Sequence, residues 1–251
     1  MASAFDAHAP AAGFRLRGAE KLAFVSAMFD RVAPTYDLLN HLISLGQTTL
    51  WRVLALSWLH ELLPPNCQVL DVGCGTGWVS WWFRLLYFRR NLTVTGVDCS
   101  EVMLEHARRV VPTAKFVKGD VSKLDFEDDF AMVTTVYTLR NFPDLEQGLR
   151  ELYRVTKPGG CVVILDAFPP SNWVMKRILQ IWLDVVMPVI AKAIMKDEMA
   201  YRYLASSIQN TVPPVAVERA LRALGAVDVV TMTYTFGTAA RIVARKPKRA
   251  E

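Results

Sequence analysis

The sequence predicts an α/β fold built on a seven-stranded, mostly parallel sheet with helices on both faces. An apolar strand, 68–72, runs into the glycine-rich loop Gly73 to Gly77, and a second strand, 93–98, ends in Asp98. Such a strand, glycine elbow, helix and second strand ending in a carboxylate form half of a doubly wound nucleotide-binding fold. Further strands then alternate with helices, which indicates parallel βαβ units in a Rossmann-like domain.

Two amphipathic helices are expected before the first strand. Residues 20–32 and 48–63 both place apolar side chains at helical spacing, and Pro64 closes the second of these segments. We therefore expect a flexible N-terminus over 1–20 and a helical cover over 21–63, ahead of the main domain.

The main domain is expected to span 64–247. Its strands are predicted at 68–72, 93–98, 114–118, 130–137 and 161–166, with a hairpin formed by 227–234 and 238–245. Its helices are predicted at 78–89, directly after the capping residue Ser100, at 144–156 and at 213–224, with a tight turn at 158–160. Residues 167–211 are apolar and helical, an insertion large enough to cover a ligand crevice. The chain after Arg245 is expected to be disordered, with 248–251 as a charged tail.

Composition narrows the class of protein. Apolar residues make up 52% of the 251 residues, enough for a large core, and the four cysteines form no C-x-x-C pair that would indicate zinc. The net charge of +5 comes without a basic stripe interleaved with aromatics, so nucleic-acid binding is disfavoured and attraction to anionic lipid explains the charge as well. The longest apolar stretch, 173–195, contains charges and Pro188, so it is not expected to span a membrane. A cytoplasmic protein is the natural interpretation.

The glycine loop indicates which nucleotide is bound. A dinucleotide fingerprint needs G-x-G-x-x-G, because the third glycine allows close helix–strand packing. Here the bulky Trp78 takes that position, directly after the loop 73–77. The tighter loop suits a ligand without phosphate, whose amino-acid end lies along bare backbone. Asp71 can accept from an ammonium group, directly or through water, and Asp98 can accept from both hydroxyls of a ribose. S-adenosylmethionine (SAM) carries both of these groups. The alternative is an ordinary glycine turn with two solvent-facing aspartates.

Several segments of the chain resemble one enzyme family. They are Met28–Asp37 with Asn40, Ser44–Arg52, Thr138–Asn141, Tyr153–Gly160 and Tyr201–Ile208. In this order they resemble the quinone C-methyltransferases of menaquinone and ubiquinone biosynthesis, within the class I SAM-dependent methyltransferases. The resemblance covers nearly all of 24–247. Trp78 and the segment Leu165–Phe168 depart from the residues usual in that family, which affects the expected substrate more than methyl transfer.

The resemblance implies a cofactor site at the carboxyl ends of the first four strands, closed by the helical cover. The residues implied at the methionine end of SAM are Asp71, Gly73, Gly75 and Thr76. Those implied around the ribose and the adenine are Asp98, Met103, Asp120 and Val121. Those implied to flank the cofactor are Val136, Tyr137 and, from the cover, Tyr36.

The implied chemistry is transfer of a methyl group from sulfur to a ring carbon. A quinol carbon is a poor nucleophile until the neighbouring hydroxyl loses its proton, so the enzyme needs a proton acceptor and donors for the phenolate. Arg140 and Asn141 follow strand four, where a substrate would meet the cofactor, and we assign Arg140 to stabilise the phenolate and position a water. Asp166 is the candidate for receiving the proton through that water. The alternatives are a surface ion pair of Arg140 with Asp144 and a loop or helix-cap role for Asp166.

The expected function is a SAM-dependent C-methyltransferase acting on a prenylated quinol precursor, demethylmenaquinol or its ubiquinol-pathway equivalent. Its expected partners are that substrate and a membrane surface, in the cytoplasm or an organelle matrix, with a homodimer as an option. A channel for the prenyl tail is one interpretation of Ile178, Ile181, Trp182, Val185, Val186, Val189 and Ile190, although their spacing favours plain core packing. Two other functions stay open: a methyltransferase on a lipid head group or a small phenol or amine, and a non-catalytic SAM-binding subunit of a quinone-biosynthesis complex.

Overall fold

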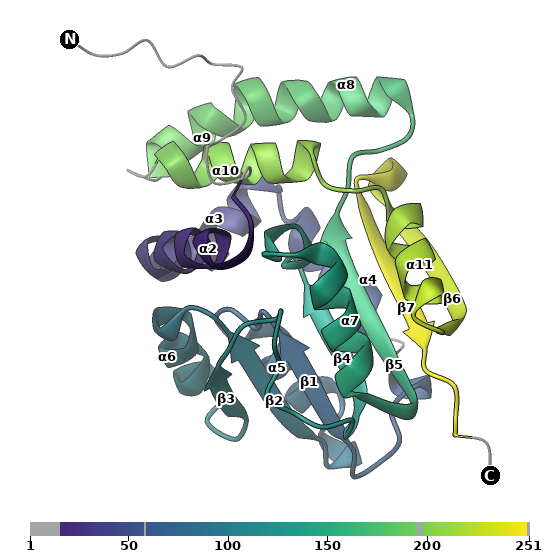
Figure 1. The fold of residues 1–251 in the computed structure, drawn as a ribbon. Helices are drawn as coiled ribbons and strands as arrows, with labels where there is room; N and C mark the ends of the chain where they lie inside the picture. Colours follow the sequence, from purple (N-terminus) through teal and green to yellow (C-terminus); the bar gives the residue numbers. More distant parts are fainter. Residues whose placement is uncertain (1–15, 58, 195–197, 250–251) are drawn as a thin grey trace.

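The computed structural model of the protein describes residues 16–57, 59–194 and 198–249. Within these residues seven strands form one sheet in the order β3-β2-β1-β4-β5-β7-β6 (Figure 1). The strands are β1 (Gln68–Val72), β2 (Thr93–Asp98), β3 (Lys115–Lys118), β4 (Phe130–Val136), β5 (Thr156–Ala167), β6 (Val227–Tyr234) and β7 (Ala239–Arg245). The first five strands pair in parallel, whereas β7 runs antiparallel to both β5 and β6. The predicted seven-stranded, mostly parallel sheet is confirmed.

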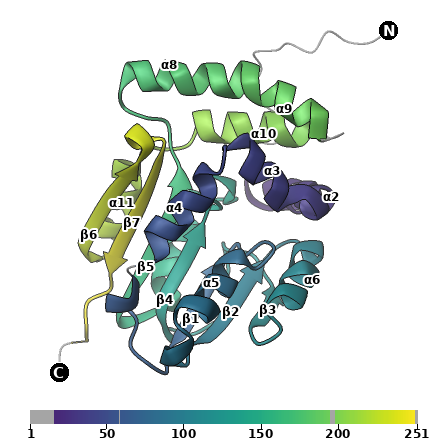
Figure 2. The same cartoon turned by 180° about the vertical axis from the view of Figure 1, so that it is seen from behind.

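Helices cover both faces of this sheet and one of its ends (Figures 1 and 2). They are α2 (Gly18–Val32), α3 (Tyr36–Ile43), α4 (Gln47–Leu56), α5 (Trp78–Leu86), α6 (Glu101–Val110), α7 (Leu145–Val155), α8 (Trp173–Ile181), α9 (Met187–Ile194), α10 (Glu198–Gln209) and α11 (Pro214–Ala223). Helices α4 and α5 share one hydrophobic core with the sheet, and α7 and α11 share another. Helices α2, α3 and α8 to α10 lie beyond the carboxyl ends of the parallel strands.

The strand order places a ligand crevice at the carboxyl ends of β1 and β4. Strand β1 lies between β2 and β4, so the chain reverses direction across the sheet after β3. Connections that diverge at such a reversal leave a gap at the ends of the two strands, and ligands of open α/β sheets bind there. The topology alone therefore locates the candidate site.

Local sequence explains where several of the helices begin or end. Ser100 caps α6 as predicted, because its hydroxyl accepts a hydrogen bond from the Met103 amide at 3.1 Å. Asp144 caps α7 in the same way, accepting from the Gln147 amide at 3.0 Å. Gly225 follows α11 with a φ of +94°, the left-handed conformation that glycine provides at the end of a helix.

Strand β5 begins earlier than the sequence predicted. It was expected at 161–166, after a tight turn at 158–160, but Thr156 already pairs with Phe130 of β4. The register between the two strands then shifts before Met132, and Gly159 takes a φ of +78°. The predicted turn is therefore an irregularity inside the strand, because the glycine pair lets β5 bulge without leaving the sheet.

The insertion after β5 forms a nearly continuous helical rod. Residues 173–194 are helical through Pro188, and a π-helical turn at Trp182–Val186 ends two residues before the proline. A π turn locally rearranges the hydrogen-bond ladder, so a residue without an amide hydrogen is tolerated. No helix in the described ranges is long and apolar enough to cross a bilayer.

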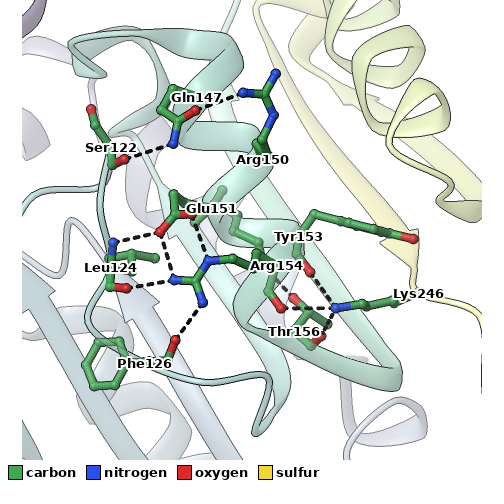
Figure 3. A network of polar contacts seen from close by, with 11 residues as sticks. Ser122, Leu124, Phe126, Gln147, Arg150, Glu151, Tyr153, Arg154, Thr156 and Lys246 are labelled. Carbon is green, nitrogen blue, oxygen red and sulfur yellow. Dashed lines mark hydrogen bonds and ion pairs between the residues drawn. The ribbon is translucent and has the colours of Figure 1, made fainter.

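The C-terminal segment is held against the end of α7 (Figure 3). The ammonium group of Lys246 donates to the backbone carbonyls of Tyr153, Arg154 and Thr156, at 3.1, 3.0 and 2.7 Å. A cation is favoured there because the last carbonyls of a helix lack helical partners. Arg249 further pairs with Asp128 at 2.9 Å. The expectation of disorder after Arg245 is therefore wrong for this part of the tail, and 250–251 lie outside the described residues.

Helix α7 also anchors the loop between β3 and β4. The carboxylate of Glu151 accepts from the amide of Leu124 at 2.8 Å, and Arg154 donates to the carbonyls of Leu124 and Phe126 at 2.7 and 2.8 Å (Figure 3). The hydrogen bond from Arg154, together with its charge, holds the pKa of Glu151 below the usual range despite partial burial. These contacts fix the loop that begins beside the candidate site.

Candidate cofactor and substrate site

A cavity lies at the reversal of strand order, where the sequence placed SAM. The residues of the implied site that line it are Tyr36, Gly73, Gly75, Asp98, Met103, Val121, Tyr137 and Asn141. Leu22, Val25 and Phe29 of α2 line it from the opposite side. The helical cover, the glycine loop and the end of β4 thus meet around one space.

The glycine loop leaves bare backbone facing this cavity. Gly73, Gly75 and Gly77 all have positive φ, at +70°, +52° and +84°, a region that disfavours other residues. A Cβ at Gly73 would collide with the side chain of Thr138, whereas nothing lies within 4 Å of a Cβ at Gly75. The loop is therefore tight on the protein side and open on the cavity side, as a ligand lying along the backbone requires.

Asp98 is the carboxylate at the cavity. One of its oxygens accepts from the amide of Gly75 at 2.8 Å, and the other from the amide of Ser100 at 2.9 Å. Burial raises the pKa of Asp98, and these two hydrogen bonds oppose the rise. Each carboxylate oxygen can accept more than one hydrogen bond, so the group keeps capacity for ribose hydroxyls.

Four of the implied cofactor residues do not line the cavity. Asp71 is 1% exposed behind the loop and accepts from the hydroxyl of Ser80 at 2.8 Å, while burial raises its pKa to about 7. Thr76 donates to Asp37 of α3 at 2.7 Å, and Asp120 accepts from the amide of Ser122 at 2.8 Å. Val136 belongs to the hydrophobic core. These contacts hold the loops and the strand around the cavity, and the role of the four residues toward the cofactor stays a prediction.

Arg140 and Asp166 form a buried ion pair. Their side chains are 8% and 1% exposed, and the Arg140 guanidinium donates directly to the carboxylate. The amide of Ala167 donates to the same carboxylate at 2.7 Å. Burial raises the pKa of Asp166, and the charge of Arg140 opposes the rise. The alternative of a surface pair between Arg140 and Asp144 is therefore wrong, because Asp144 caps α7 instead.

A second cavity adjoins the first. It is lined by Arg140 and Asn141 and by residues of α2, α3 and α10. Phe29, Tyr36 and Asn141 line both cavities, so the two spaces share a wall. The Asn141 side-chain oxygen accepts from the Tyr203 hydroxyl at 3.2 Å, and burial raises the pKa of Tyr203 to about 12. Asn141 is thus fixed between the sheet and α10.

The helical cover is hydrogen-bonded to the loops that form the site. Asp30 accepts from the hydroxyl of Ser100 at 2.5 Å, and Ser26 donates to the carbonyl of Cys99 at 3.1 Å. Lys21 donates to the carbonyl of Arg140 at 3.3 Å. These contacts reach the ends of β2 and β4. Sequence reasoning assigned none of them, although Asp30 lies inside the segment Met28–Asp37 that carried the resemblance.

Arg52 is a further residue without an assigned role in the sequence analysis. Its guanidinium stacks between the rings of Trp78 and Tyr137, 4.7 and 5.0 Å from their centroids. Trp78 also packs against Trp82, with ring centroids 5.1 Å apart. The bulky residue after the glycine loop therefore serves a contact with α4. The signal that could have found Arg52 is its position at the end of the segment Ser44–Arg52.

Tyr137 holds a strained position at the end of β4. Its φ is +59°, rare for a bulky residue, and its hydroxyl donates to the carbonyl of Thr48 at 2.9 Å. Strained backbone persists where surrounding contacts over-determine it, and such sites cluster around bound ligands. The strain directs the Tyr137 ring into the wall of the cofactor cavity.

The apolar residues expected as a channel line neither cavity. Ile178, Ile181, Val185 and Val189 are 53%, 48%, 59% and 68% exposed on the outer side of the rod. Trp182 and Ile190 instead pack with α3 and α10. The interpretation as a channel is wrong because α10, not the rod, lies next to the second cavity. Plain packing against the sheet is also wrong for the exposed four, which we call the outer stripe.

Comparisons with known proteins agree with the geometry. Residues 17–246 match the ubiE/COQ5 methyltransferase family. The chain is 38% identical over 222 residues to a demethylmenaquinone methyltransferase of Chlorobaculum tepidum, covering 87% of this chain and 90% of that protein. It is 35% identical to the ubiquinone/menaquinone biosynthesis C-methyltransferase UbiE of Desulfotalea psychrophila, covering 85% and 87% of the two chains.

A solved structure supports the fold. A SAM-dependent methyltransferase from Thermotoga maritima, described as a possible histamine N-methyltransferase, superposes with a TM-score of 0.62 at 20% identity, covering 88% of this chain and 99% of that one. At this identity the likeness concerns the fold alone. Together with the family match over most of the chain, it confirms the expected class of SAM-dependent methyltransferase. The chain belongs to the ubiE/COQ5 methyltransferase family.

Proposed function

We propose that this protein transfers the methyl group of SAM to a ring carbon of a prenylated quinol, demethylmenaquinol. The observation that carries the proposal is the pair of adjoining cavities, one at the glycine loop and one at Arg140, which share Tyr36 and Asn141. Relatives with 34–38% identity over most of their length are named demethylmenaquinone methyltransferases. The ubiquinol-pathway precursor is a closely related substrate.

The first cavity suits SAM. The open backbone at Gly75 receives the methionine end, and Asp98 accepts from the ribose hydroxyls. Met103 and Val121 supply apolar surface for the adenine. Asp71 supports the loop from behind, so its effect on the ammonium group is electrostatic and does not need direct contact.

The second cavity suits the quinol. In the reaction the ring carbon forms a bond to the methyl carbon while the bond to sulfur breaks, and the ring loses a proton. The products are the methylated quinol, S-adenosylhomocysteine and one proton, so atoms and charge balance. Arg140 stabilises the phenolate that precedes the attack, an interaction of a kind that contributes about 3–4 kcal/mol in a water-excluded site.

The ion pair changes the role proposed for Asp166. A carboxylate that already binds a guanidinium directly would lose that contact on accepting a proton. We therefore assign Asp166 to hold Arg140 in the site and to keep it from adopting other conformations. The hydroxyl proton then leaves through water in the second cavity, with Asn141 and Tyr203 as the neutral polar groups beside it.

Contact with a membrane surface follows from the substrate and from the outer stripe. A prenyl tail is insoluble, and the second cavity is lined on the side of α10 by Ala200, Tyr201 and Leu204. Helix α9 packs on α10, and the rod that contains α9 carries the outer stripe next to the basic residues Lys176 and Arg177. Amphipathic helices with exposed apolar side chains and nearby cations bind anionic lipid surfaces. We propose that the protein works in the cytoplasm at such a surface.

The direct experiment supplies SAM with a labelled methyl group and several acceptors. Reduced demethylmenaquinone in detergent should take up the label, whereas phosphatidylethanolamine and small phenols should not. Label in the lipid head group but not in the quinol would favour the second function. Binding of SAM without label in any acceptor would favour the non-catalytic subunit.

The membrane contact has its own test. Val185→Asp places a charge in the outer stripe, and Val215→Asp places one at a similarly exposed site on α11, where the wild-type valine is 54% exposed. In a flotation assay with vesicles that contain phosphatidylglycerol, Val215→Asp should float with the vesicles as the wild type does, whereas Val185→Asp should not. If both variants float equally, or if the wild type does not float, the outer stripe is not the membrane-binding surface.

A further inference from the structure

Arg52 of α4 is a buried cation with an aromatic ring on either side. It is 7% exposed, and its guanidinium stacks on Trp78 and Tyr137 at 4.7 and 5.0 Å from the ring centroids. Its Nε atom is buried without a hydrogen-bond partner. Across the described part of the chain, Arg52 forms no ion pair. Burying a guanidinium without an anion is costly, so the arrangement calls for a reason beyond packing.

The charges that act on the cavity wall at Tyr137 do not balance. Arg52 and Arg140 both act on the Tyr137 hydroxyl, whereas Asp166 is the carboxylate that opposes them. Asp166 is itself paired with Arg140. At Tyr36 the same two arginines act, and Asp37 opposes them more weakly than either. Positive charge is therefore in excess where the two cavities meet.

We propose that Arg52 is a second cation of the substrate site, which lies behind Tyr137 and favours the anionic form of the bound quinol. This rests on the proposed function, because the anion is the phenolate that precedes methyl transfer. Arg52 lines neither cavity, so it acts through the field it creates and through the Tyr137 ring that it holds. Arg52 is therefore a positioning residue. The same role accounts for Trp78, whose ring it contacts, and for the segment Ser44–Arg52, which it ends.

The effect has a predictable size. A unit charge about 10 Å away, at an effective dielectric constant of about 20, shifts a neighbouring ionisation by roughly one pH unit. A residue that merely joins α4 to α5 would change the melting temperature but not this ionisation. The pH at which the bound ligand is half ionised therefore distinguishes the electrostatic role of Arg52 from a purely structural one.

The first arm uses 2-hydroxy-1,4-naphthoquinone, a soluble quinone whose visible absorption reports ionisation of its hydroxyl. It is titrated while bound to the full-length protein saturated with S-adenosylhomocysteine. Arg52→Met should raise the pH midpoint of the bound quinone by roughly one unit. Arg52→Lys keeps the charge, and Arg89→Met removes an exposed arginine from outside the site, so both should stay near the wild type. Arg52→Gln replaces Arg52→Met if that variant does not fold.

The second arm follows methylation of the quinol against pH. The acid limb of kcat should move to higher pH by the same amount in Arg52→Met, with the Kd for SAM changed less than about threefold. A midpoint equal to that of the wild type in folded Arg52→Met, or no binding of the quinone by the wild type, would overturn the inference. If the wild type methylates no quinol while the midpoint still moves, the proposed substrate is wrong and the role of Arg52 stands.

Discussion

The two cavities are built in different ways. The floor of the cofactor cavity is formed by backbone and by residues close in sequence, the loop 73–77 and Asp98, which binds the Gly75 amide across 23 positions, whereas α2 and Tyr36 close it from the cover. The substrate cavity is assembled from side chains far apart in the chain. Asn141 meets Tyr203 across 62 positions, and Lys21 reaches the Arg140 carbonyl across 119.

This difference separates a general device from a specific one. Backbone amides and a ribose carboxylate bind the same cofactor whatever the acceptor, so they need little from the rest of the molecule. The acceptor is recognised by charges and apolar surfaces contributed by α2, α3 and α10. Substitutions in the cofactor cavity should therefore affect SAM affinity, and substitutions in the substrate cavity should affect turnover.

The largest expected effect is on the substrate side. Arg140→Met should lower kcat by about 10²–10³-fold, because the phenolate loses its cation, while SAM still binds. The variant should also lose about 3–5 kcal/mol of unfolding free energy, since Asp166 is left as an unpaired buried charge. Steady-state kinetics, SAM titration and urea unfolding measure the three quantities.

A double variant serves as the control for this prediction. Arg140→Met with Asp166→Leu removes both charges, so stability should recover while kcat stays low. Recovery of kcat together with stability would show that the ion pair has only a structural role.

On the cofactor side, Asp98→Ala should weaken SAM binding by about 100-fold. The substitution removes the acceptor for the ribose and frees the amides of Gly75 and Ser100, and hydrogen bonds to charged groups contribute about 1.5–3 kcal/mol each. Isothermal titration calorimetry gives the Kd. Asp125→Ala, at an exposed carboxylate outside the site, should leave the Kd nearly unchanged, and an equal loss in both variants would refute the ribose assignment.

A second prediction on the cofactor side concerns Gly73 and Thr138, which both line that cavity. Gly73→Ala should weaken SAM binding by about tenfold, because the new Cβ meets the Thr138 side chain and the φ of +70° disfavours alanine. Adding Thr138→Ala should restore part of the affinity by removing the collision. No recovery in the double variant would mean that the backbone conformation alone accounts for the loss.

The last expected effect is on stability rather than on binding or turnover, and it takes the form of a pH dependence. Burial raises the pKa of Asp71 from 3.8 to about 7, so between these values the folded protein binds more protons than the unfolded one. The unfolding free energy of the SAM-free protein should therefore fall as pH rises from about 4 to about 7, and this contribution should be constant above. Urea unfolding at several pH values should show a smaller fall in Asp71→Asn than in the wild type, with the remainder due to Asp98 and Asp166, whose pKa values are also raised by burial. Asp228→Asn, at an exposed carboxylate, should behave as the wild type.

The sequence predicted the sheet well, for physical reasons, and it placed the glycine loop and Asp98 at the cavity that the structure contains. Hydrophobic periodicity, helix caps and glycines are signals carried by residues close in sequence. The bounds of β1 and β2 therefore agree with the prediction, and Ser100 caps α6 as expected. The glycine loop and Asp98 lie together because parallel strands end at one edge of the sheet. Spacing did not reveal that Asp71 accepts from Ser80 behind the loop, because side-chain direction depends on such neighbours, and its role toward the cofactor stays a prediction.

The substrate side could be predicted only in outline. Arg140 and Asp166 were named, but their direct pairing depends on how closely the ends of β4 and β5 approach each other. The outer stripe was misassigned because the position of the rod depends on α10, which lies between it and the second cavity. Arg52 went without a role because its partners, Trp78 and Tyr137, belong to other elements.

The most direct measurement is a single turnover. The protein is loaded with SAM carrying a labelled methyl group, separated from free cofactor, and mixed with reduced demethylmenaquinone in detergent. The label should appear on the quinol ring, and S-adenosylhomocysteine should form in equal amount. Label that stays on SAM in the presence of the quinol, or that moves to a different acceptor, would contradict the arrangement of two cavities with a shared wall.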